Sequence, residues 1–432
     1  MTIEQLYSIY KQYPSVQTDT RKLKQGDIFF ALKGPSFNGN EFAQQALAAG
    51  AAYAVIDEKA FKTSDKTILV SDTLTTLQQL AKYHRQQFNV SPAGGQVPFI
   101  AITGSNGKTT TKELVYAVLS SEFKTYTTQG NLNNHIGIPL TILSVRPDAE
   151  MAVIEMGANH QKEIEDYCKY TLPTHGIITN AGKAHLEGFG GVEGVRKGKG
   201  ELFDYLRAHN GTAFVMWDYN YLQTMSKGIK EIIRYGTKEA DITGTVLKSE
   251  PFLEVSIEKG ATLKEIRTQL VGDYNLPNVL VAVAIGKYFK VSDEKIKNAI
   301  ETYSPSNSRS QLLRKGDNEI ILDAYNANPS SMKAAIENFA HMHYASKVLM
   351  LGAMAELGTE SLEEHKNIIE LIQKHPWKEV VLVGGDFCKI EHPFISFANS
   401  SEAANWLKKM NFHNTALLIK GSRSMQMEKT LE

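Results

Sequence analysis

Several features are scarce in this sequence, and each scarcity excludes a class of protein. Cys168 and Cys388 are the only cysteines in 432 residues, and their spacing supports neither a disulfide framework nor a zinc site. Lysine plus arginine and aspartate plus glutamate both number 47, so no overall field attracts nucleic acid or an anionic membrane. We therefore expect two plain thiols and no nucleic-acid partner.

Long apolar runs are also missing. The longest run, Val279 to Ile285, is far shorter than a bilayer span, which predicts no integral membrane segment. The start, Met1 to Leu6, lacks the basic and apolar regions of a secretory signal, and we find no internal repeat or low-complexity tract. A cytoplasmic protein is expected.

What is present favours several α/β domains. The hydrophobic content of 42% can form more than one core, and the length suggests two to four domains. Short apolar runs alternate with helix-like stretches, and residues 89–98 have the Pro, Gly and Ser content of a linker. We expect an α/β fold of three domains, at residues 1–90, 98–305 and 309–432.

The domains differ in their expected sheets. The central one should be a doubly wound, mostly parallel sheet, extended by three antiparallel strands within 241–271 and followed by helices near 276–289 and 292–302. The C-terminal one should be Rossmann-like, with strands at 319–322, 347–351, 379–383 and 416–419.

The residues 100–110 predict a phosphate-binding loop between a strand and a helix. Gly104 and Gly107 allow backbone N–H groups to converge on phosphate oxygens, Lys108 adds a positive charge, and Thr109 offers a hydroxyl to magnesium. Two residues separate the glycines instead of the usual four, so the loop is a variant. The alternative is a glycine turn without a ligand.

The helix after this loop should bury an apolar face and expose Lys112 and Glu113. Glu155 follows the apolar run 151–154, which places its carboxylate at the carboxyl end of a parallel strand beside the loop. Glu155, Thr109 and a nucleotide could together supply the oxygen ligands of magnesium. A solvated strand-end glutamate is the alternative.

Lys199 falls on the apolar face of an expected helix at 192–206, from which Lys197 and Glu201 should point away. Burial favours the neutral amine of a lysine, and a neutral amine reacts with carbon dioxide to give a carbamate, a carboxylate-like metal ligand. The alternative is a lysine whose stem covers apolar surface.

Three other groups of polar residues remain open on this reasoning. His185 follows the strand at 176–180, but a lone histidine is usually structural. Asn133, Asn134 and His135 could form a ligand-binding loop or an asparagine turn. Asn275 and Asn278 open the helix near 276, where an N-cap role would explain one of them.

The loop resembles that of the Mur ligase family, ATP-dependent amide-bond ligases of peptidoglycan precursor synthesis. The resemblance covers nearly the whole chain, is densest from 100 to 206, and includes the motifs at 131–140, 155–160, 180–190 and 323–332. It implies a three-domain architecture with ATP and Mg²⁺ as cofactors. It also implies UDP-N-acetylmuramoyl-tripeptide and D-alanyl-D-alanine as substrates, joined through an acyl phosphate.

The resemblance also implies roles for residues. It assigns catalytic roles to Lys108, His185 and Lys199, and it places magnesium on Thr109, Glu155, His185 and a carbamylated Lys199. It implies an ATP site made of Gly104, Ser105, Asn106, Gly107, Lys108, Thr109, Thr110, Asn278, Arg309, Asp323 and Tyr325. It implies a substrate site that includes Thr20, Arg21, Asn133, Asn134 and His135. Ser308 replaces the family's glycine before Arg309, which puts the backbone geometry there in doubt.

Two other functions remain as alternatives. A sibling ligase, such as a folylpolyglutamate synthase or a Mur enzyme that adds a single amino acid, would share the loop and the mechanism. A non-catalytic nucleotide-binding protein would be free to lose Lys108, Glu155, His185 or Lys199, yet all four are present. We expect a monomer. No motif in the sequence indicates whether the tripeptide ends in lysine or diaminopimelate.

Overall fold

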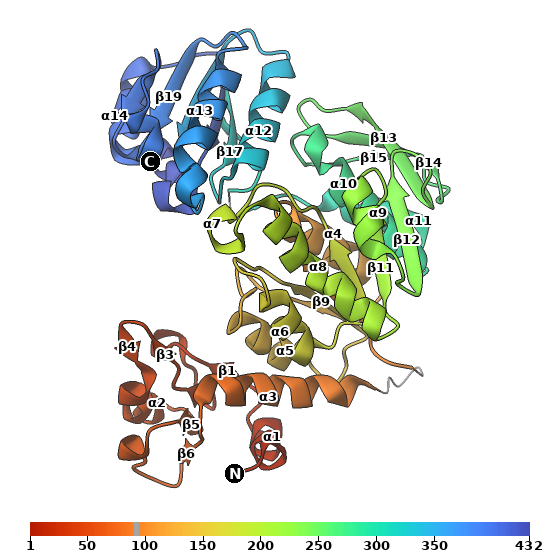
Figure 1. The fold of residues 1–432 in the computed structure, drawn as a ribbon, viewed down its shortest axis with the longest axis vertical. Helices are drawn as coiled ribbons and strands as arrows, with labels where there is room; N and C mark the ends of the chain where they lie inside the picture. Colours follow the sequence, from red (N-terminus) through yellow and green to blue (C-terminus); the bar gives the residue numbers. More distant parts are fainter. Residues whose placement is uncertain (90–94, 307) are drawn as a thin grey trace.

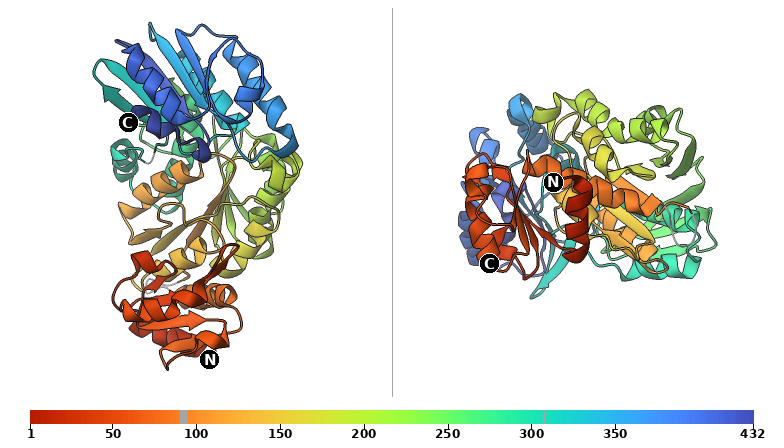
Figure 2. Two further views of the ribbon diagram at one scale, coloured as in Figure 1. Left: turned by 90° about the vertical axis from the view of Figure 1, so that its left-hand side faces the viewer. Right: turned by 90° about the horizontal axis from the view of Figure 1, so that it is seen from below.

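The computed structural model describes residues 1–89, 95–306 and 308–432. Three α/β units follow one another along the long axis of the molecule, with the two termini at opposite ends (Figures 1 and 2). The expected fold class and three-domain layout are therefore confirmed. The linker expected at 89–98 includes residues 90–94, which lie outside the described residues.

The first unit is built on a small parallel sheet with the strand order β1-β2-β5-β6. Its strands are β1 (Val16–Gln17), β2 (Ile28–Phe30), β5 (Tyr53–Ile56) and β6 (Thr67–Leu69), with the hairpin β3 (Lys33–Gly34) and β4 (Phe37–Asn38) beside them. Its helices are α1 (Ile3–Gln12), α2 (Ala43–Ala48) and α3 (Thr73–Gln86), with short 3-10 turns η1 (Thr20–Lys22), η2 (Gly39–Phe42), η3 (Lys59–Phe61) and η4 (Gln87–Asn89).

Helix α3 joins the first unit to the central one. It starts at an Asp72 cap, whose Oδ1 accepts the N–H of Thr75 at 2.6 Å. It packs on α1 and on two helices of the central unit, α5 (Gly137–Ser144) and α6 (Glu163–Thr171). Near its end, Arg85 is fully buried and donates to the carbonyls of Thr171 and Leu172 at the end of α6. The guanidinium therefore caps a helix of the neighbouring unit.

The central unit has a nine-stranded sheet with the order β15-β14-β13-β12-β11-β10-β7-β9-β8. Its strands are β7 (Phe99–Thr103), β8 (Thr125–Thr127), β9 (Met151–Glu155), β10 (His175–Ile178), β11 (Thr212–Met216), β12 (Glu231–Gly236), β13 (Ile242–Lys248), β14 (Glu254–Lys259) and β15 (Glu265–Arg267). Pairing is parallel from β8 to β13 and antiparallel from β13 to β15, so the expected antiparallel extension is confirmed.

The helices of the central unit cover both faces of this sheet (Figure 1). Besides α5 and α6 they are α4 (Lys108–Ser120), α7 (Leu186–Phe189), α8 (Val192–Ala208), α9 (Asn220–Ser226), α10 (Leu276–Tyr288) and α11 (Asp293–Thr302), with the 3-10 turn η5 (Asp273–Asn275). Helix α10 is buried along most of its length against α4, α11 and the strands β11 to β13, which explains its apolar sequence.

Two charged residues that should face solvent are buried instead. Lys112 is 1% exposed, and its Nζ donates to the Thr128 carbonyl at 2.8 Å and to Glu113 at 2.6 Å. Glu201 is also buried, because its carboxylate accepts backbone N–H groups at the start of α6. Helix N-termini offer such unsatisfied donors and favour negative charge. Lys197 is exposed, as expected.

The third unit has a six-stranded sheet with the order β16-β17-β21-β18-β19-β20, parallel except for β16. Its strands are β16 (Gln311–Lys315), β17 (Asn318–Asp323), β18 (Lys347–Gly352), β19 (Glu379–Val383), β20 (Ile395–Phe397) and β21 (Ala416–Lys420). Its helices are α12 (Pro329–His341), α13 (Ser361–Ile372) and α14 (Ser400–Met410), with 3-10 turns η6 (Gly358–Glu360), η7 (Gly385–Lys389), η8 (Arg423–Met425) and η9 (Met427–Leu431). The two edge strands, β16 and β20, are absent from the sequence-based expectation.

None of the helices in the described ranges has the length and apolar character that a bilayer crossing requires.

Candidate active site

A cavity of ≈ 770 Å³ lies where the central and third units meet. It brings together most of the expected site residues. Its walls include Ser105, Asn106, Gly107, Lys108, Thr109, Thr110, Asn133, Asn134, His135, Glu155, His185, Asn278, Arg309, Asp323 and Tyr325. Among the expected residues, Gly104 and Lys199 lie behind this wall, and Thr20 and Arg21 are in the first unit.

The phosphate-type loop connects β7 to α4, as the sequence predicts. Gly104 has φ +143°, and a Cβ there would lie 2.0 Å from Thr179 Oγ1, so both conformation and space require glycine. Gly107 has φ +79° and precedes the first residue of α4. The loop therefore directs the N-terminus of a helix into the cavity, which is a site suited to phosphate.

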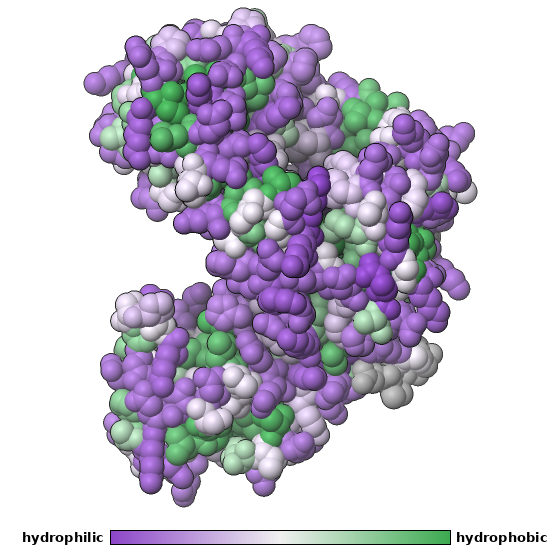
Figure 3. Space-filling model, viewed as in Figure 1, coloured by the Kyte–Doolittle hydropathy of each residue, from purple (hydrophilic) through white to green (hydrophobic). Residues whose placement is uncertain are grey.

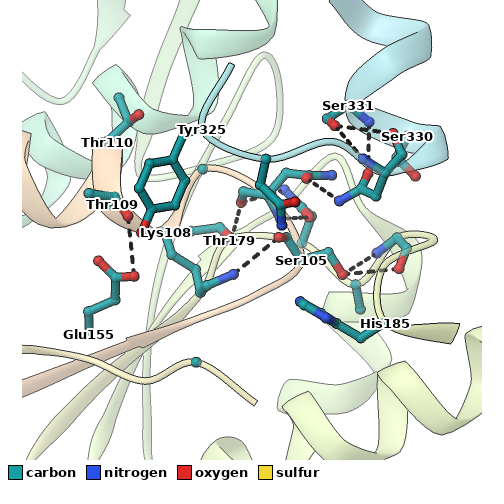
Figure 4. A pocket seen from close by; sticks show the side chains of 18 of the residues that line it. Ser105, Lys108, Thr109, Thr110, Glu155, Thr179, His185, Tyr325, Ser330 and Ser331 are labelled. Carbon is teal, nitrogen blue, oxygen red and sulfur yellow. Dashed lines mark hydrogen bonds between the residues drawn. The ribbon is translucent and has the colours of Figure 1, made fainter. Parts of the chain in front are cut away.

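Lys108 is the first residue of α4. Its Nζ donates to the carbonyls of Gly104 at 2.7 Å and Ser105 at 3.1 Å, which holds the amine against the loop (Figure 4). Burial lowers the pKa of Lys108 from its ordinary value. The view in Figure 4 shows Glu155 and His185 on opposite sides of this lysine.

Glu155 ends β9 and faces the loop. Its Oε1 accepts hydrogen bonds from Thr109 Oγ1 at 3.2 Å and Asn133 Nδ2 at 2.8 Å. Its Oε2 is buried and has no hydrogen-bond partner among the described residues. An unpartnered buried carboxylate oxygen beside a threonine hydroxyl fits magnesium, which prefers hard oxygen ligands.

This donor set is sparse. The described residues contain no group of three or more His, Cys, Asp or Glu side chains arranged to hold a metal ion. Magnesium commonly uses one or two protein carboxylates together with water and substrate phosphates, so a sparse set suits it. The residues present therefore fit magnesium bound together with a nucleotide.

His185 lies in the loop between β10 and α7 with φ +51°, a left-handed conformation that is unusual for a non-glycine residue. Its Nδ1 lies 2.6 Å from Glu356 Oε2 of the third unit, although that nitrogen has no aligned hydrogen bond. The contact with His185 lowers the pKa of Glu356. A side chain of the third unit thus sits directly against this histidine.

Lys199 is fully buried on α8. Its Nζ donates to the Ala158 carbonyl at 2.9 Å and lies 4.9 Å from the centre of the Phe189 ring. Burial lowers the pKa of Lys199 well below its ordinary value, and the nearby charge of Lys108 lowers it further. The aliphatic chain of Lys199 does not extend to solvent. Burial therefore favours the neutral form of the amine, which lies just behind the cavity wall.

Glu201 has no role in the sequence-based site, yet it shapes this region. It accepts the N–H groups of Lys162 at 2.6 Å and Glu165 at 3.0 Å. Lys199 and Glu201 together hold both ends of the segment from Ala158 to Lys162. The sequence feature that could have identified Glu201 is its position two residues after Lys199, the lysine on the apolar face of the helix.

Asn278 reaches the loop from α10. Its Oδ1 accepts from Thr111 Oγ1 at 2.9 Å, and its Nδ2 donates to Asn275 Oδ1 at 2.8 Å. Asn275 donates in turn to the Val271 carbonyl, and neither side chain caps α10. Asn275 occupies the expected N-cap position of α10 without a side-chain cap hydrogen bond, because both asparagines belong to a buried hydrogen-bond chain that ends at α4.

The third unit contributes charged and aromatic groups. Asp323 ends β17, where its Oδ2 lies 2.5 Å from the buried Lys420 amine and its Oδ1 accepts the N–H of Ser310 at 3.1 Å. The Arg309 guanidinium lies 3.5 Å from the centre of the Tyr325 ring, a cation–π contact. Ser308 has φ +55°, so this serine adopts the backbone conformation that its family glycine would favour.

A direct hydrogen bond joins the loop to the third unit, and sequence reasoning missed it. Asn328 Nδ2 donates to Asn106 Oδ1 at 2.8 Å, while Asn328 also caps α12. Asn180 Oδ1 accepts the N–H of Asn106 at 3.0 Å. Asn180 and Asn328 were not expected as site residues. Both lie in motifs that carry the family resemblance, and those motifs are the signal that could have identified them.

The expected substrate residues of the first unit lie far from this cavity along the long axis of the molecule. Thr20 and Arg21 begin η1, and Arg21 pairs with Asp19 at 2.8 Å while remaining 86% exposed. Lys33 pairs with Asp57 at 2.9 Å. Figure 3 shows the molecule hollowed on the side where the first unit faces the other two. The substrate role of Thr20 and Arg21 stays a prediction.

Comparisons with known proteins agree with this geometry. Residues 12–85 match the Mur ligase family catalytic domain, 102–286 the Mur ligase middle domain, and 308–423 the Mur ligase glutamate ligase domain. A relative from Escherichia coli K12, named UDP-N-acetylmuramoyl-tripeptide--D-alanyl-D-alanine ligase, is 35% identical over 96% of this chain and 92% of its own. The chain belongs to the Mur ligase family.

Solved structures extend the Mur ligase comparison to three dimensions. MurF from Acinetobacter baumannii is 30% identical with a TM-score of 0.87, covering 100% of this chain and 97% of that one. MurF from Thermotoga maritima, solved in complex with ADP, is 25% identical with a TM-score of 0.85, covering 96% of each chain. The three-domain Mur ligase architecture therefore extends over this chain.

Proposed function

We propose that this chain is an ATP-dependent ligase that joins D-alanyl-D-alanine to UDP-N-acetylmuramoyl-tripeptide in peptidoglycan precursor synthesis. The observation that carries the proposal is the near-full-length similarity to relatives of that name, 35% identical in Escherichia coli and 33% identical in Bacillus subtilis. The phosphate-type loop at the junction of two domains supplies the matching chemistry.

The reaction divides into two displacements. The terminal carboxylate of the tripeptide attacks the γ-phosphorus of ATP, so an acyl phosphate forms and ADP leaves. The amine of D-alanyl-D-alanine then attacks the acyl carbon, loses a proton, and releases phosphate as the C–N bond forms. The N–H groups at the start of α4 and the amine of Lys108 bind the phosphates and stabilise the charge that develops on them.

We assign Thr109 and Glu155 as magnesium ligands, and His185 with a carbamylated Lys199 as ligands of a second ion. Bound magnesium would neutralise charge on the phosphate oxygens. The unpartnered Glu155 Oε2 and the low pKa of Lys199 support these assignments, since a neutral amine is the form that accepts carbon dioxide.

The remaining assignments complete the proposal. Gly104 to Thr110, Asn278, Arg309, Asp323 and Tyr325 would bind ATP, while Asn133, Asn134 and His135 would contact the tripeptide. Thr20 and Arg21 would bind the UDP end, in a domain that spans residues 1–90, with 98–305 and 309–432 as the other two. The proposal places a monomer in the cytoplasm, where its product serves cell shape and division.

The position of the cavity suits an intermediate that water would destroy. The third domain covers the loop through Asn328, and Ser330 Oγ accepts the N–H of Lys183 at 3.1 Å. An acyl phosphate formed beneath this contact would be shielded from bulk water.

A phosphate-release assay tests the function. Purified protein receives ATP and Mg²⁺ with UDP-N-acetylmuramoyl-tripeptide, D-alanyl-D-alanine, both, or neither. We expect phosphate release only when both are present, and parallel reactions with single amino acids or glutamate as the acceptor separate the sibling ligases. Rapid ATP hydrolysis without a carboxylate substrate would contradict the mechanism.

A further inference from the structure

The third domain contacts the loop around His185 through several residues. Lys183 Nζ lies 2.5 Å from Glu364 Oε1 on α13, and the backbone N–H of Lys183 donates to Ser330 Oγ at the start of α12. Two residues further on, His185 Nδ1 lies 2.6 Å from Glu356 Oε2. The backbone N–H of Glu187 also donates to the Glu356 carbonyl at 3.4 Å.

Glu364 is the buried member of its ion pair. Its side chain is 7% exposed, whereas that of Lys183 is 45% exposed. Removing a carboxylate from water is unfavourable unless a positive partner or hydrogen-bond donors compensate. Lys183 supplies that compensation from across the domain boundary, so docking of the third domain and burial of Glu364 depend on each other.

The next residue on α13 connects this ion pair to Glu356. His365 is fully buried, its Nδ1 donates to the Ser361 carbonyl at 2.7 Å, and its Nε2 accepts the N–H of Met354 at 3.0 Å. The segment from Met354 to Glu356 is thereby fixed to α13. Adjacent side chains of one helix thus contact the central domain and hold the Glu356 segment.

We infer that Glu364 is a positioning residue of the ligase, whose ion pair with Lys183 docks α13 on the His185 loop and so sets Glu356 against the imidazole. The inference rests on the proposed function for the role of His185. Glu356 occupies the Nδ1 side of the ring, which leaves Nε2 as the nitrogen for a ligand in the cavity. The site is complete only when the third domain is docked.

Steady-state kinetics of charge variants test the positioning role. We expect Glu364→Gln and Lys183→Met each to lower kcat about 10-fold with little change in KM for ATP. A 10-fold effect lies within the usual range of coupling between two sites of one protein. The exchanged pair, Lys183→Glu with Glu364→Lys, should recover most of the loss. A matched exchange of Lys295 and Glu122, an ion pair within the central domain, should leave kcat unchanged.

A distance measurement reports docking without activity. Spin labels are placed on the exposed Cys388 of the third domain and on Lys238→Cys of the central domain, while Cys168 is buried and stays unlabelled. We expect Glu364→Gln to broaden the label-to-label distance distribution and the exchanged pair to narrow it again. Because Lys183 is half-exposed, Lys183→Met carries the test if Glu364→Gln does not fold.

The outcomes separate the positioning role from simpler ones. Wild-type kcat and an unchanged distance distribution in both single variants would overturn the inference. A lower melting temperature with kcat and distances unaffected would overturn it as well, since that is a purely structural ion pair. If the wild-type protein releases no phosphate with the proposed substrates, the proposed function fails, while the distance measurement still decides the docking.

Discussion

At the scale of single residues, the site depends on two lysines whose surroundings lower the pKa of the amine. Lys199 is fully buried and Lys108 is half-buried in the cavity wall, and loss of contact with water lowers the pKa of each amine. Their surroundings differ, because Lys108 donates to two loop carbonyls at the cavity and Lys199 to one carbonyl behind it. The same residue type is therefore suited to binding phosphate at one position and to forming a carbamate at the other.

Lys108→Ala should leave the fold intact and remove most of the ligase activity. The side chain faces the cavity and contributes charge that is worth about 3 kcal/mol or more in the transition state, a fall of over a hundredfold in kcat. Phosphate release and the melting temperature are measured together. Near-normal turnover would show that this loop is not the ATP site.

Lys199→Ala should abolish ligation, and millimolar bicarbonate or a short carboxylic acid should restore part of it by occupying the vacated ligand position. Lys199→Arg should fail too, because a guanidinium forms no carbamate and brings a positive charge to the metal. The exposed Lys197→Ala is the matched control. Tolerance of arginine, with no response to added carboxylate, would indicate a structural lysine.

At the scale of elements, helix α3 carries a buried histidine whose protonation makes the stability of the fold depend on pH. His84 is buried on α3, where its Nε2 donates to the Val145 carbonyl at 2.8 Å and its Nδ1 accepts from Tyr7 at 3.1 Å. Burial lowers the pKa of His84 to about 4, the Val145 carbonyl opposes that shift, and Arg146 adds to it. The imidazole is therefore neutral in the folded protein at pH 7.

Stability should fall as pH drops from 6.5 towards 4. In that window the unfolded chain protonates His84 but the folded chain does not, which removes about 3 kcal/mol of unfolding free energy by pH 4. His84→Gln keeps a donor for Val145 and should reduce the slope of unfolding free energy against pH by up to one proton. An identical slope in urea titrations of both proteins would contradict this assignment.

The main elements and the loop were predictable from sequence because their signals are local. Glycine spacing and apolar runs depend on neighbouring residues, so β7, α4 and the buried interior strands follow from the pattern. Lys112 and Glu201 were placed wrongly, because each is buried by a partner distant in sequence: Thr128 and the start of α6. The edge strands β16 and β20 have no fully buried residue, so their apolar patterns carry little signal.

Contacts between domains were the least predictable part of the site. Asn106 with Asn328 and Lys183 with Glu364 are separated by more than a hundred positions, and no periodic pattern joins them. The family resemblance indicated the motifs that contain most of these residues but not their pairing. Pairing follows only from how the third domain lies on the central one.

At the scale of the whole molecule, the two domain junctions are built differently. The junction at the cavity consists of polar contacts such as Asn328 with Asn106. The junction below it buries Arg85, whose guanidinium stacks 3.9 Å from the centre of the Phe99 ring and donates to two carbonyls at the end of α6. Polar junctions permit relative motion, whereas the buried one favours a fixed arrangement.

Arg85→Met should lower the free energy of unfolding by about 2–4 kcal/mol, because it leaves the Thr171 and Leu172 carbonyls unsatisfied. Scanning calorimetry should also resolve a separate early transition for the first domain. Lys82→Met, on the exposed side of the same helix, is the matched control and should change neither quantity. A single transition at the wild-type temperature would argue against a coupling role for Arg85.

The burial of Arg85 has a practical consequence for dissecting the protein. A chain shortened to start at residue 98 would retain Phe99 and α6 but lose the cation that caps the helix and covers the ring. The exposed carbonyls and apolar surface would favour aggregation. A shortened chain should therefore keep the first domain joined to the central one, and it should keep the third domain as well if it is to retain Arg309, Asp323 and Tyr325 of the proposed ATP site.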